Sequence, residues 1–157
     1  MNKKTIVLLD NSVIDRVLSY FKGTHFQLAI TARTNHVNPE YKKKYPTLVV
    51  VPNIARLDHS FFDVGEVFGD ENSVMISNKL LSLAANQNSV KEVGKQTNFN
   101  QRDDADIIVA AYINKCRYLV SDDKKFMLKD NVKELMRGYG LEIISSDEFK
   151  NIIMAKQ

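Results

Sequence analysis

The chain has 157 residues, 44% hydrophobic and 26% charged, a composition that suits one globular domain over residues 1–157 with a sizeable core. Its 22 basic and 19 acidic residues give a net charge of +3, which permits nucleic-acid binding without arguing for it. A single cysteine, Cys116, excludes an internal disulfide and a cysteine-rich zinc site, and no apolar run reaches the ~18 residues of a membrane span.

The N-terminal part has the order strand, acid, helix. Thr5–Leu9 is a continuous apolar run, as expected of a strand buried on both faces of a parallel sheet. Asp10 ends the strand, and Asn11 or Ser12 can cap a helix that Gly23 stops. Because Asp10 interrupts the apolar run and no small-residue cleavage site follows, we expect a cytoplasmic protein.

A basic tract follows the second predicted strand, His25–Thr31. Lys42, Lys43 and Lys44 stand between two tyrosines, after a turn at residues 38–39. Lysines neutralise phosphates and tyrosines can stack on bases, so one interpretation is a nucleic-acid contact. The other interpretation is a solvated surface loop.

A second buried-strand pattern, Thr47–Val51, precedes a predicted helix that begins at about Asn53. Asp58 lies four residues after Ile54, on or beside the apolar side of that helix, where an acid is less expected than on the solvent side. Farther along, Val74–Ile76 is typical of a short strand. Apolar residues at 80–84 favour a helix, and the polar run 86–101 suggests a surface connection with a short helical piece.

The most informative stretch is Asp103–Phe126, which has acids at both ends. An apolar segment too long for a loop lies between them and predicts a buried helix that begins on carboxylates, followed by a strand, Tyr118–Ser121. The acids are Asp103, Asp104, Asp106, Asp122 and Asp123. Farther on, we predict a helix, or a turn followed by a helix, over Met127–Arg137, then a strand Leu141–Ile144 and a final helix capped at Ser145–Ser146. Strands that alternate with helices predict an α/β fold with a mostly parallel central sheet flanked by helices.

Four acids from separate segments are expected at one edge of this sheet, because ligand sites in open parallel sheets gather at the carboxyl ends of the strands. They are Asp10, Asp58, Asp104 and either Asp122 or Asp123. Grouped carboxylates repel one another, so a cation is expected among them, and oxygen ligands favour Mg²⁺ or Mn²⁺. Such ions activate water and neutralise phosphate oxygens during phosphodiester hydrolysis.

Each acid also has a structural interpretation. Asp103, Asp104 and Asp106 suit the start of a helix, where the helix dipole favours carboxylates. Asp104 shares a helix side with the apolar residues, whereas Asp106 points to nearly the opposite side. We therefore assign Asp104 as the ligand and Asp106 as a supporting or solvated residue.

Four segments resemble the PIN-domain family of nucleases. They are Ile6–Val13, Val49–Asp58, Asp103–Phe126 and Glu142–Phe149, about half of the chain, and Asp103–Phe126 is the most specific. The resemblance implies that Asp10, Asp58, Asp104 and Asp123 are the catalytic acids. Ser12 stands at the Ser/Thr/Asn position of that family and would support the metal ligands. We assign Asp122, beside Asp123, a supporting role.

The resemblance implies a metal-dependent nuclease that acts on RNA. Many members are toxins of the VapC type, so a cognate inhibitor protein and a homodimer are possible partners. The family more often has Glu as its second acid, and Glu40, Asp63 and Glu66 are alternatives to Asp58 here.

The leading interpretation is a divalent-metal endoribonuclease. Asp10, Asp104 and Asp123 would hold the metal. The lysines Lys42, Lys43, Lys44 and Lys124, with Lys125, would seat the phosphate backbone. A second interpretation is a catalytically degraded domain that binds RNA or protein. A third, phosphotransfer through Asp10 as nucleophile, leaves Asp58 and Asp104 unexplained.

Overall fold

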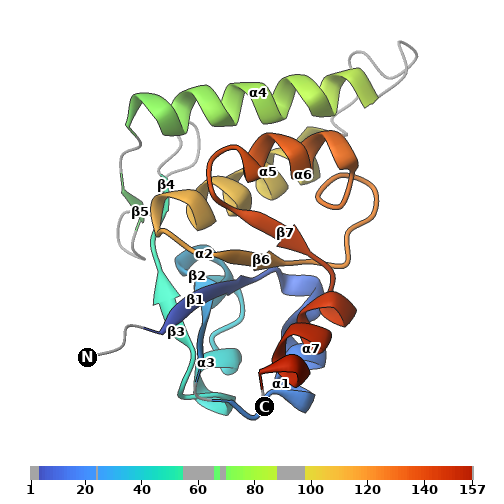
Figure 1. Ribbon diagram of the computed structural model, residues 1–157. Coiled ribbons are helices and arrows are strands. Elements are labelled where there is room, and N and C mark those ends of the chain that lie inside the picture. Colours follow the sequence, from blue (N-terminus) through green and yellow to red (C-terminus); the bar gives the residue numbers. More distant parts are fainter. Residues whose placement is uncertain (1–3, 24, 55–65, 68–69, 88–97, 157) are drawn as a thin grey trace.

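A computed structural model describes residues 4–23, 25–54, 66–67, 70–87 and 98–156 of the chain (Figure 1). Its central strands are β1 (Thr5–Leu9), β2 (Phe26–Thr31), β3 (Val49–Val51), β6 (Tyr118–Val120) and β7 (Glu142–Ile144). Two short strands, β4 (Asn53–Ile54) and β5 (Glu66–Val67), pair separately. The helices are η1 (Asn11–Val13), α1 (Ile14–Tyr20), α2 (Ala32–Val37), α3 (Glu40–Lys44), α4 (Glu71–Gln87), α5 (Asn98–Ile113), α6 (Asp130–Arg137) and α7 (Ser146–Ala155).

The central sheet has the strand order β3-β2-β1-β6-β7, and every pairing in it is parallel. The predicted α/β class is confirmed, and the predicted mostly parallel sheet is wholly parallel over these five strands. β1 lies at the centre because its apolar residues can be buried on both sides, as the unbroken Thr5–Leu9 run predicted.

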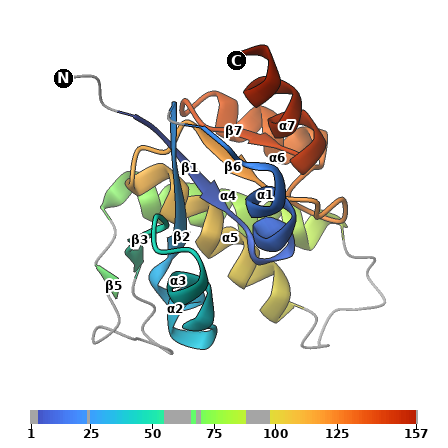
Figure 2. The same cartoon turned by 90° about the horizontal axis from the view of Figure 1, so that it is seen from below.

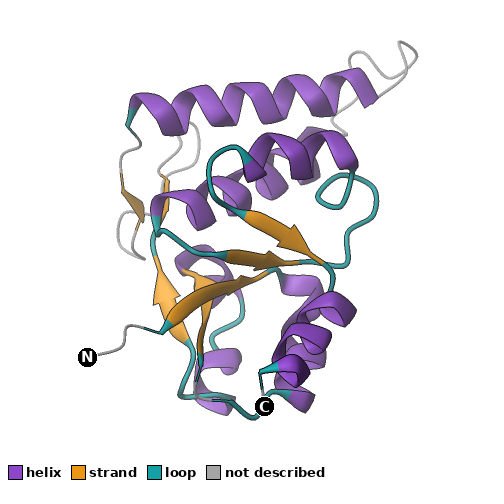
Figure 3. Ribbon diagram, viewed as in Figure 1, coloured by secondary structure: helices purple, strands orange, loops and turns teal. Residues whose placement is uncertain are grey.

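Helices cover both faces of the sheet, so its side chains alternate between two cores (Figure 3). Leu8 points into the core that α4, α5 and α6 close. Val7 and Leu9 point into the core that α1, α3 and α7 close. Figures 1 and 2 show α7 beside α1, and α2 and α3 beside β2 and β3.

The last helix is fixed at both its start and its middle. The Ser145 hydroxyl accepts the backbone N–H of Glu148, whose carboxylate in turn accepts the N–H of Ser145, so the predicted cap is a full capping box. Phe149 is fully buried, with its ring centroid 5.4 Å from that of Phe26 and 6.5 Å from that of Phe21. This aromatic group joins α7 to β2 and to the end of α1.

The predicted strand Val74–Ile76 is wrong, because these residues belong to α4. β-Branched residues favoured a strand, but Ile76, Leu80 and Ala84 recur at intervals of four and form the buried side of the helix. Val74 is 54% exposed, on the opposite side. Tertiary packing therefore overrides local propensity here.

The helix that carries the central acids begins earlier than predicted. α5 starts at Asn98, within the run that its polarity assigned to a surface connection, so Asp103 and Asp104 lie beyond its first turn. The helix dipole therefore does not explain these acids, because its effect is confined to the first turn.

Four other local predictions are also wrong. Asn53–Ile54 is strand β4 rather than the start of a helix, because it pairs with Glu66–Val67. Lys42–Lys44 lie in the helix α3, not in a loop. Neither Asn11 nor Ser12 caps α1 with its side chain, because a 3₁₀ turn intervenes, and α1 ends at Tyr20, before Gly23. Asp58 and Asp63 lie outside the described residues.

Within the described ranges, none of the helices combines the length and apolarity needed to cross a bilayer.

Truncating Phe149 tests how the aromatic group joins α7 to β2. We expect Phe149→Ala to lower the free energy of unfolding by about 3–5 kcal/mol, because it leaves a cavity between α7 and β2. Urea denaturation followed by circular dichroism measures the change. Met154→Ala, at a site that is 62% exposed on the same helix, is the control and should change it by less than about 0.5 kcal/mol. Equal effects of the two substitutions would contradict this packing.

Candidate active site

The strand order places a topological switch point between β1 and β6. From β1 the chain first adds β2 and β3 on one side, and later adds β6 and β7 on the other. In sheets of this kind the connections leave in opposite directions from the switch point and open a crevice at the carboxyl ends of the strands. Asp10 directly follows β1, and Ser121, Asp122 and Asp123 directly follow β6.

A buried serine joins two of the predicted acids. The Ser121 hydroxyl, which is fully buried, donates to Asp10 Oδ2 at 2.9 Å and accepts the backbone N–H of Asp123 at 3.1 Å. The Ser12 hydroxyl donates to the same Oδ2 at 2.9 Å, which is the contact that its predicted supporting role requires. Asp10 is only 7% exposed, and its carboxylate is held by hydroxyl groups from both neighbouring strand ends.

The third acid, Asp104, comes from α5 and lies close enough to both others to respond to their charge. Burial raises the pKa of Asp104 from 3.8 to about 8, with further increases from the charges of Asp123 and Asp10 and from a hydrogen bond to Asp123. Neighbouring Asp103 makes the smallest contribution. At neutral pH without a cation, Asp104 therefore holds a proton that an ordinary aspartate would have lost.

Asp123 also organises the loop after β6. Its Oδ1 accepts the backbone N–H of Lys125 at 2.9 Å, and its Oδ2 accepts that of Met127 at 3.4 Å. These bonds orient the carboxylate and place Lys124 and Lys125, both exposed, directly beside it. The predicted contact lysine Lys124 is thus next to the acids along the chain.

Asp122 instead contacts α1 and α7. It accepts the backbone N–H of Ser146 at 3.0 Å and its hydroxyl at 2.8 Å, and it pairs with Arg16 at 3.0 Å. The Tyr20 hydroxyl donates to the carbonyl of Ser146 in the same region, and burial, with the nearby Asp122 charge, raises the pKa of Tyr20 to about 12. Asp122 therefore fixes the start of α7, and Asp123 is the acid that adjoins Asp104.

Asp106 is buried, not solvated, because it pairs with an arginine that the sequence did not single out. Arg33 Nη1 lies 3.1 Å from Asp106 Oδ2, and their side chains are 16% and 9% exposed. The backbone N–H of Arg33 also donates to Asn53 Oδ1 at 2.8 Å. This network ties the end of β2 to α5 and to the segment after β3, beside the acids.

Sequence reasoning missed Ser121, Arg33 and Asn53. Ser121 had a signal, because it directly precedes the acid pair and Ser12 stands two residues after the acid of β1. Arg33 had none, since the sequence gives no indication that it pairs with a residue 73 positions away.

The other predicted lysines lie far from these acids. Lys42 Nζ donates to the carbonyl of Pro46 at 2.8 Å and to that of Leu48, just before β3 begins. Lys43 and Lys44 are exposed on the same short helix, and Lys44 lies over the ring of Tyr45. The acids follow the carboxyl ends of the strands, so this basic helix adjoins the opposite edge of the sheet.

The alternatives to Asp58 fall in different places. Glu40 is exposed in the first turn of α3, and Glu66 is part of β5. Over the described part of the chain, no three His, Cys, Asp or Glu side chains are arranged closely enough to hold one metal ion. Asp10 and Asp123 are therefore near enough to Asp104 to raise its pKa, but the three carboxylates do not converge on one point.

The donor chemistry nevertheless fits a hard cation. Carboxylate oxygens are the ligands that Mg²⁺ and Mn²⁺ prefer. The pKa of Asp104 is raised mainly by burial and further by the charges of Asp123 and Asp10, and a divalent ion would offset that repulsion. Both hydroxyl donors to Asp10 engage Oδ2, and no described residue donates to Oδ1. No protein-family model matches this chain, and no curated protein is significantly similar to it.

The raised pKa of Asp104 predicts a pH dependence of stability. The folded chain binds a proton there that the unfolded chain has released above pH 4, so this group favours folding at low pH and loses that contribution between about pH 4 and pH 8. In EDTA, we expect Asp104→Asn to flatten the decline in the free energy of unfolding across this range. Denaturant titrations at half-unit pH steps measure it. Parallel curves for the variant and the unmodified chain would contradict the assignment.

Proposed function

We propose that this protein is a divalent-metal-dependent endoribonuclease of the cytoplasm. One observation carries the proposal: Asp10 and Asp123 occupy the switch point, joined through Ser121, and Asp104 senses the charge of both. A partly buried carboxyl group whose pKa is raised by burial and by neighbouring carboxylates, as that of Asp104 is, is a feature of functional sites and suits an Mg²⁺ or Mn²⁺ ion. The resemblance of four segments to PIN-domain nucleases points to the same chemistry.

Each residue has a distinct role in this proposal. Asp10, Asp104 and Asp123 would hold the ion, and Asp58, outside the described residues, is the fourth acid. Ser12 and Ser121 keep Asp10 oriented through Oδ2, so its Oδ1 is available for the ion. When bound, the ion supplies an activated water and neutralises charge on the phosphate oxygens.

The cations beside the acids would seat the RNA. Lys124 and Lys125 flank Asp123 and are exposed, so they can contact phosphates on either side of the scissile bond. Arg33 instead holds α5, the helix that carries Asp104, in place through its ion pair with Asp106. A toxin role, a cognate inhibitor protein and a homodimer follow from the PIN resemblance alone and stay predictions.

A second candidate is a non-catalytic RNA- or protein-binding domain of the same fold. It is favoured by the spacing of the described carboxylates, which do not converge on one ion. The two candidates differ in whether the site binds a metal.

Neutralising the acid at the end of β1 tests the nuclease directly. We expect Asp10→Asn to reduce cleavage of single-stranded RNA at least 100-fold, because Oδ1 would no longer be an anionic ligand. Gel electrophoresis of a labelled RNA, with Mg²⁺ and with EDTA, measures the rate. Asp15→Asn, an exposed acid in the first turn of α1, is the matched control and should cleave at the unmodified rate. Full activity of Asp10→Asn would exclude this site.

Metal binding separates the two candidates even if the RNA substrate is not cleaved. We expect Mg²⁺ or Mn²⁺ to raise the melting temperature, because an ion that binds only the folded chain adds about 2.7 kcal/mol at a concentration 100 times its Kd. Differential scanning fluorimetry measures the shift. Asp104→Asn should lose the shift, and Asp15→Asn should keep it. A metal-independent melting temperature for the unmodified chain would favour the non-catalytic domain.

A further inference from the structure

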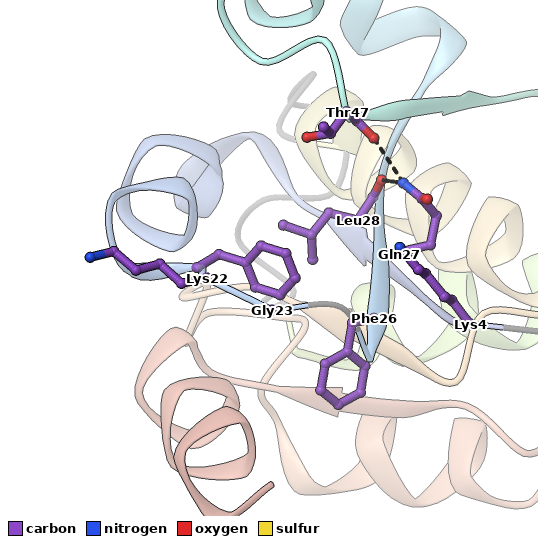
Figure 4. Close-up of a pocket in the computed structure, with 8 residues that line it drawn as sticks. Lys4, Lys22, Gly23, Phe26, Gln27, Leu28 and Thr47 are labelled. Carbon is purple, nitrogen blue, oxygen red and sulfur yellow. Dashed lines mark hydrogen bonds between the residues drawn. The ribbon is translucent and has the colours of Figure 1, made fainter. Parts of the chain in front are cut away.

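A cavity lies at the amino ends of β1 and β2, whereas the acids lie at the carboxyl ends of the strands. It has a volume of about 480 Å³ and opens where the residue before β1, the segment after α1, the first half of β2 and the segment before β3 meet (Figure 4). This volume is within the range of small-ligand sites. Lys4 directly precedes β1 and Asp10 directly follows it, so the cavity lies about 20 Å from the acids at ~3.3 Å per residue of strand.

The walls of the cavity are apolar and well fixed. Phe21, Phe26 and Leu28 line it, and Phe26 and Leu28 are 5% and 4% exposed. The rings of Phe21 and Phe26 both pack against the fully buried ring of Phe149, so their positions are set by the core. A rigid wall with aromatic rings suits a flat, partly apolar ligand.

One polar side chain at the rim leaves an acceptor for such a ligand. Gln27 Nε2 donates to the carbonyl of Thr47 at 2.8 Å and to that of Leu28 at 3.0 Å. These bonds fix the amide group, and no described residue donates to its Oε1. Gln27 and Leu28 are successive strand residues that point to opposite faces of the sheet, so a sugar hydroxyl, rather than a base that lies against Leu28, would donate to this oxygen.

Positive charge surrounds the opening. Lys4 and Lys22 line the cavity and are exposed, and Figure 4 shows them on opposite sides of Leu28. Lys42 lies at the wall beside Thr47, since it donates to the carbonyls of Pro46 and Leu48. Lys156 lies over the ring of Phe26, 5.6 Å from its centroid. The described lining residues include no acidic side chain, so the cavity complements an anion.

We propose that this cavity binds one nucleotide of a single-stranded RNA, with its base against Phe21 and Leu28 and its phosphates near Lys4 and Lys22. Aromatic walls beside lysines are the combination by which proteins hold single strands without sequence preference. The choice of RNA rests on the proposed function. The direct line of about 20 Å between this cavity and the acids follows β1, which helices cover on both faces, so an RNA that reaches both must pass around those helices over a longer path. The cavity would then hold the substrate away from the cleavage site.

The test measures RNA binding in the Asp10→Asn background, where cleavage is blocked. Lys4→Glu/Lys22→Glu reverses the charge at the cavity, and Thr47→Trp narrows its opening at an exposed position. Lys79→Glu/Lys129→Glu is the control, because it makes the same charge change at exposed lysines of α4 and of the segment before α6. Fluorescence anisotropy of a labelled 12-nucleotide RNA gives Kd over a range of salt concentrations, and thermal melting confirms folding.

We expect both cavity variants to weaken binding about tenfold relative to the control. The charge reversal should also lower the slope of log K against log salt by about 1.4, for two lost phosphate contacts on a single strand. In the Asp10→Asn protein, amide NMR signals of Gly23 and Gln27 should shift when the RNA is added. The NMR result holds even if a cavity variant fails to fold.

Other outcomes overturn the inference. Equal weakening by the control would show a general effect of net charge. Binding of a free mononucleotide as tight as that of the RNA would show a small-molecule site. Unchanged Kd with unchanged Gly23 and Gln27 signals would exclude the cavity.

If the unmodified chain binds RNA here but does not cleave it, the proposed function fails and this site stands.

Discussion

The carboxyl group of Asp104 is held partly out of water beside two other carboxylates, and the rest of the site depends on how that arrangement is tolerated. A buried aspartate near two negative charges is stable only if it keeps its proton or gains a cation. The pKa of about 8 corresponds to the first solution. Binding of the proposed Mg²⁺ or Mn²⁺ ion is the second solution. At neutral pH the ion would displace the proton of Asp104.

The fold imposes this arrangement through one strand pairing. β1 and β6 are neighbours at the switch point, so the acids that follow them are brought to one crevice whatever lies between them in the sequence. Ser121 converts that proximity into fixed geometry by bonding to both strand ends. Asp122 and Asp106 are used differently, as anchors for α7 and for Arg33, and they support the layers on either side.

The fold class, and the placement of Asp10 and Asp123 after neighbouring strands, could be predicted because both depend on simple patterns. Continuous apolar runs mark buried strands such as β1, and an acid after a strand marks the carboxyl edge of the sheet. Element boundaries were less predictable: polar residues from Asn98 onward belong to α5, and Val74–Ile76 follows the packing of α4. The ion pair of Arg33 with Asp106 could not be predicted, because it joins segments 73 residues apart.

The protonation state of Asp104 links the fold to the proposed chemistry, and it can be measured site by site. Carbon-detected NMR of ¹³C-labelled protein, with Asp104 assigned through Asp104→Asn, follows its carboxyl signal as pH is varied. We expect a midpoint near pH 8 in EDTA and a midpoint well below pH 7 in saturating Mg²⁺. A midpoint near pH 4 that Mg²⁺ does not move would contradict it.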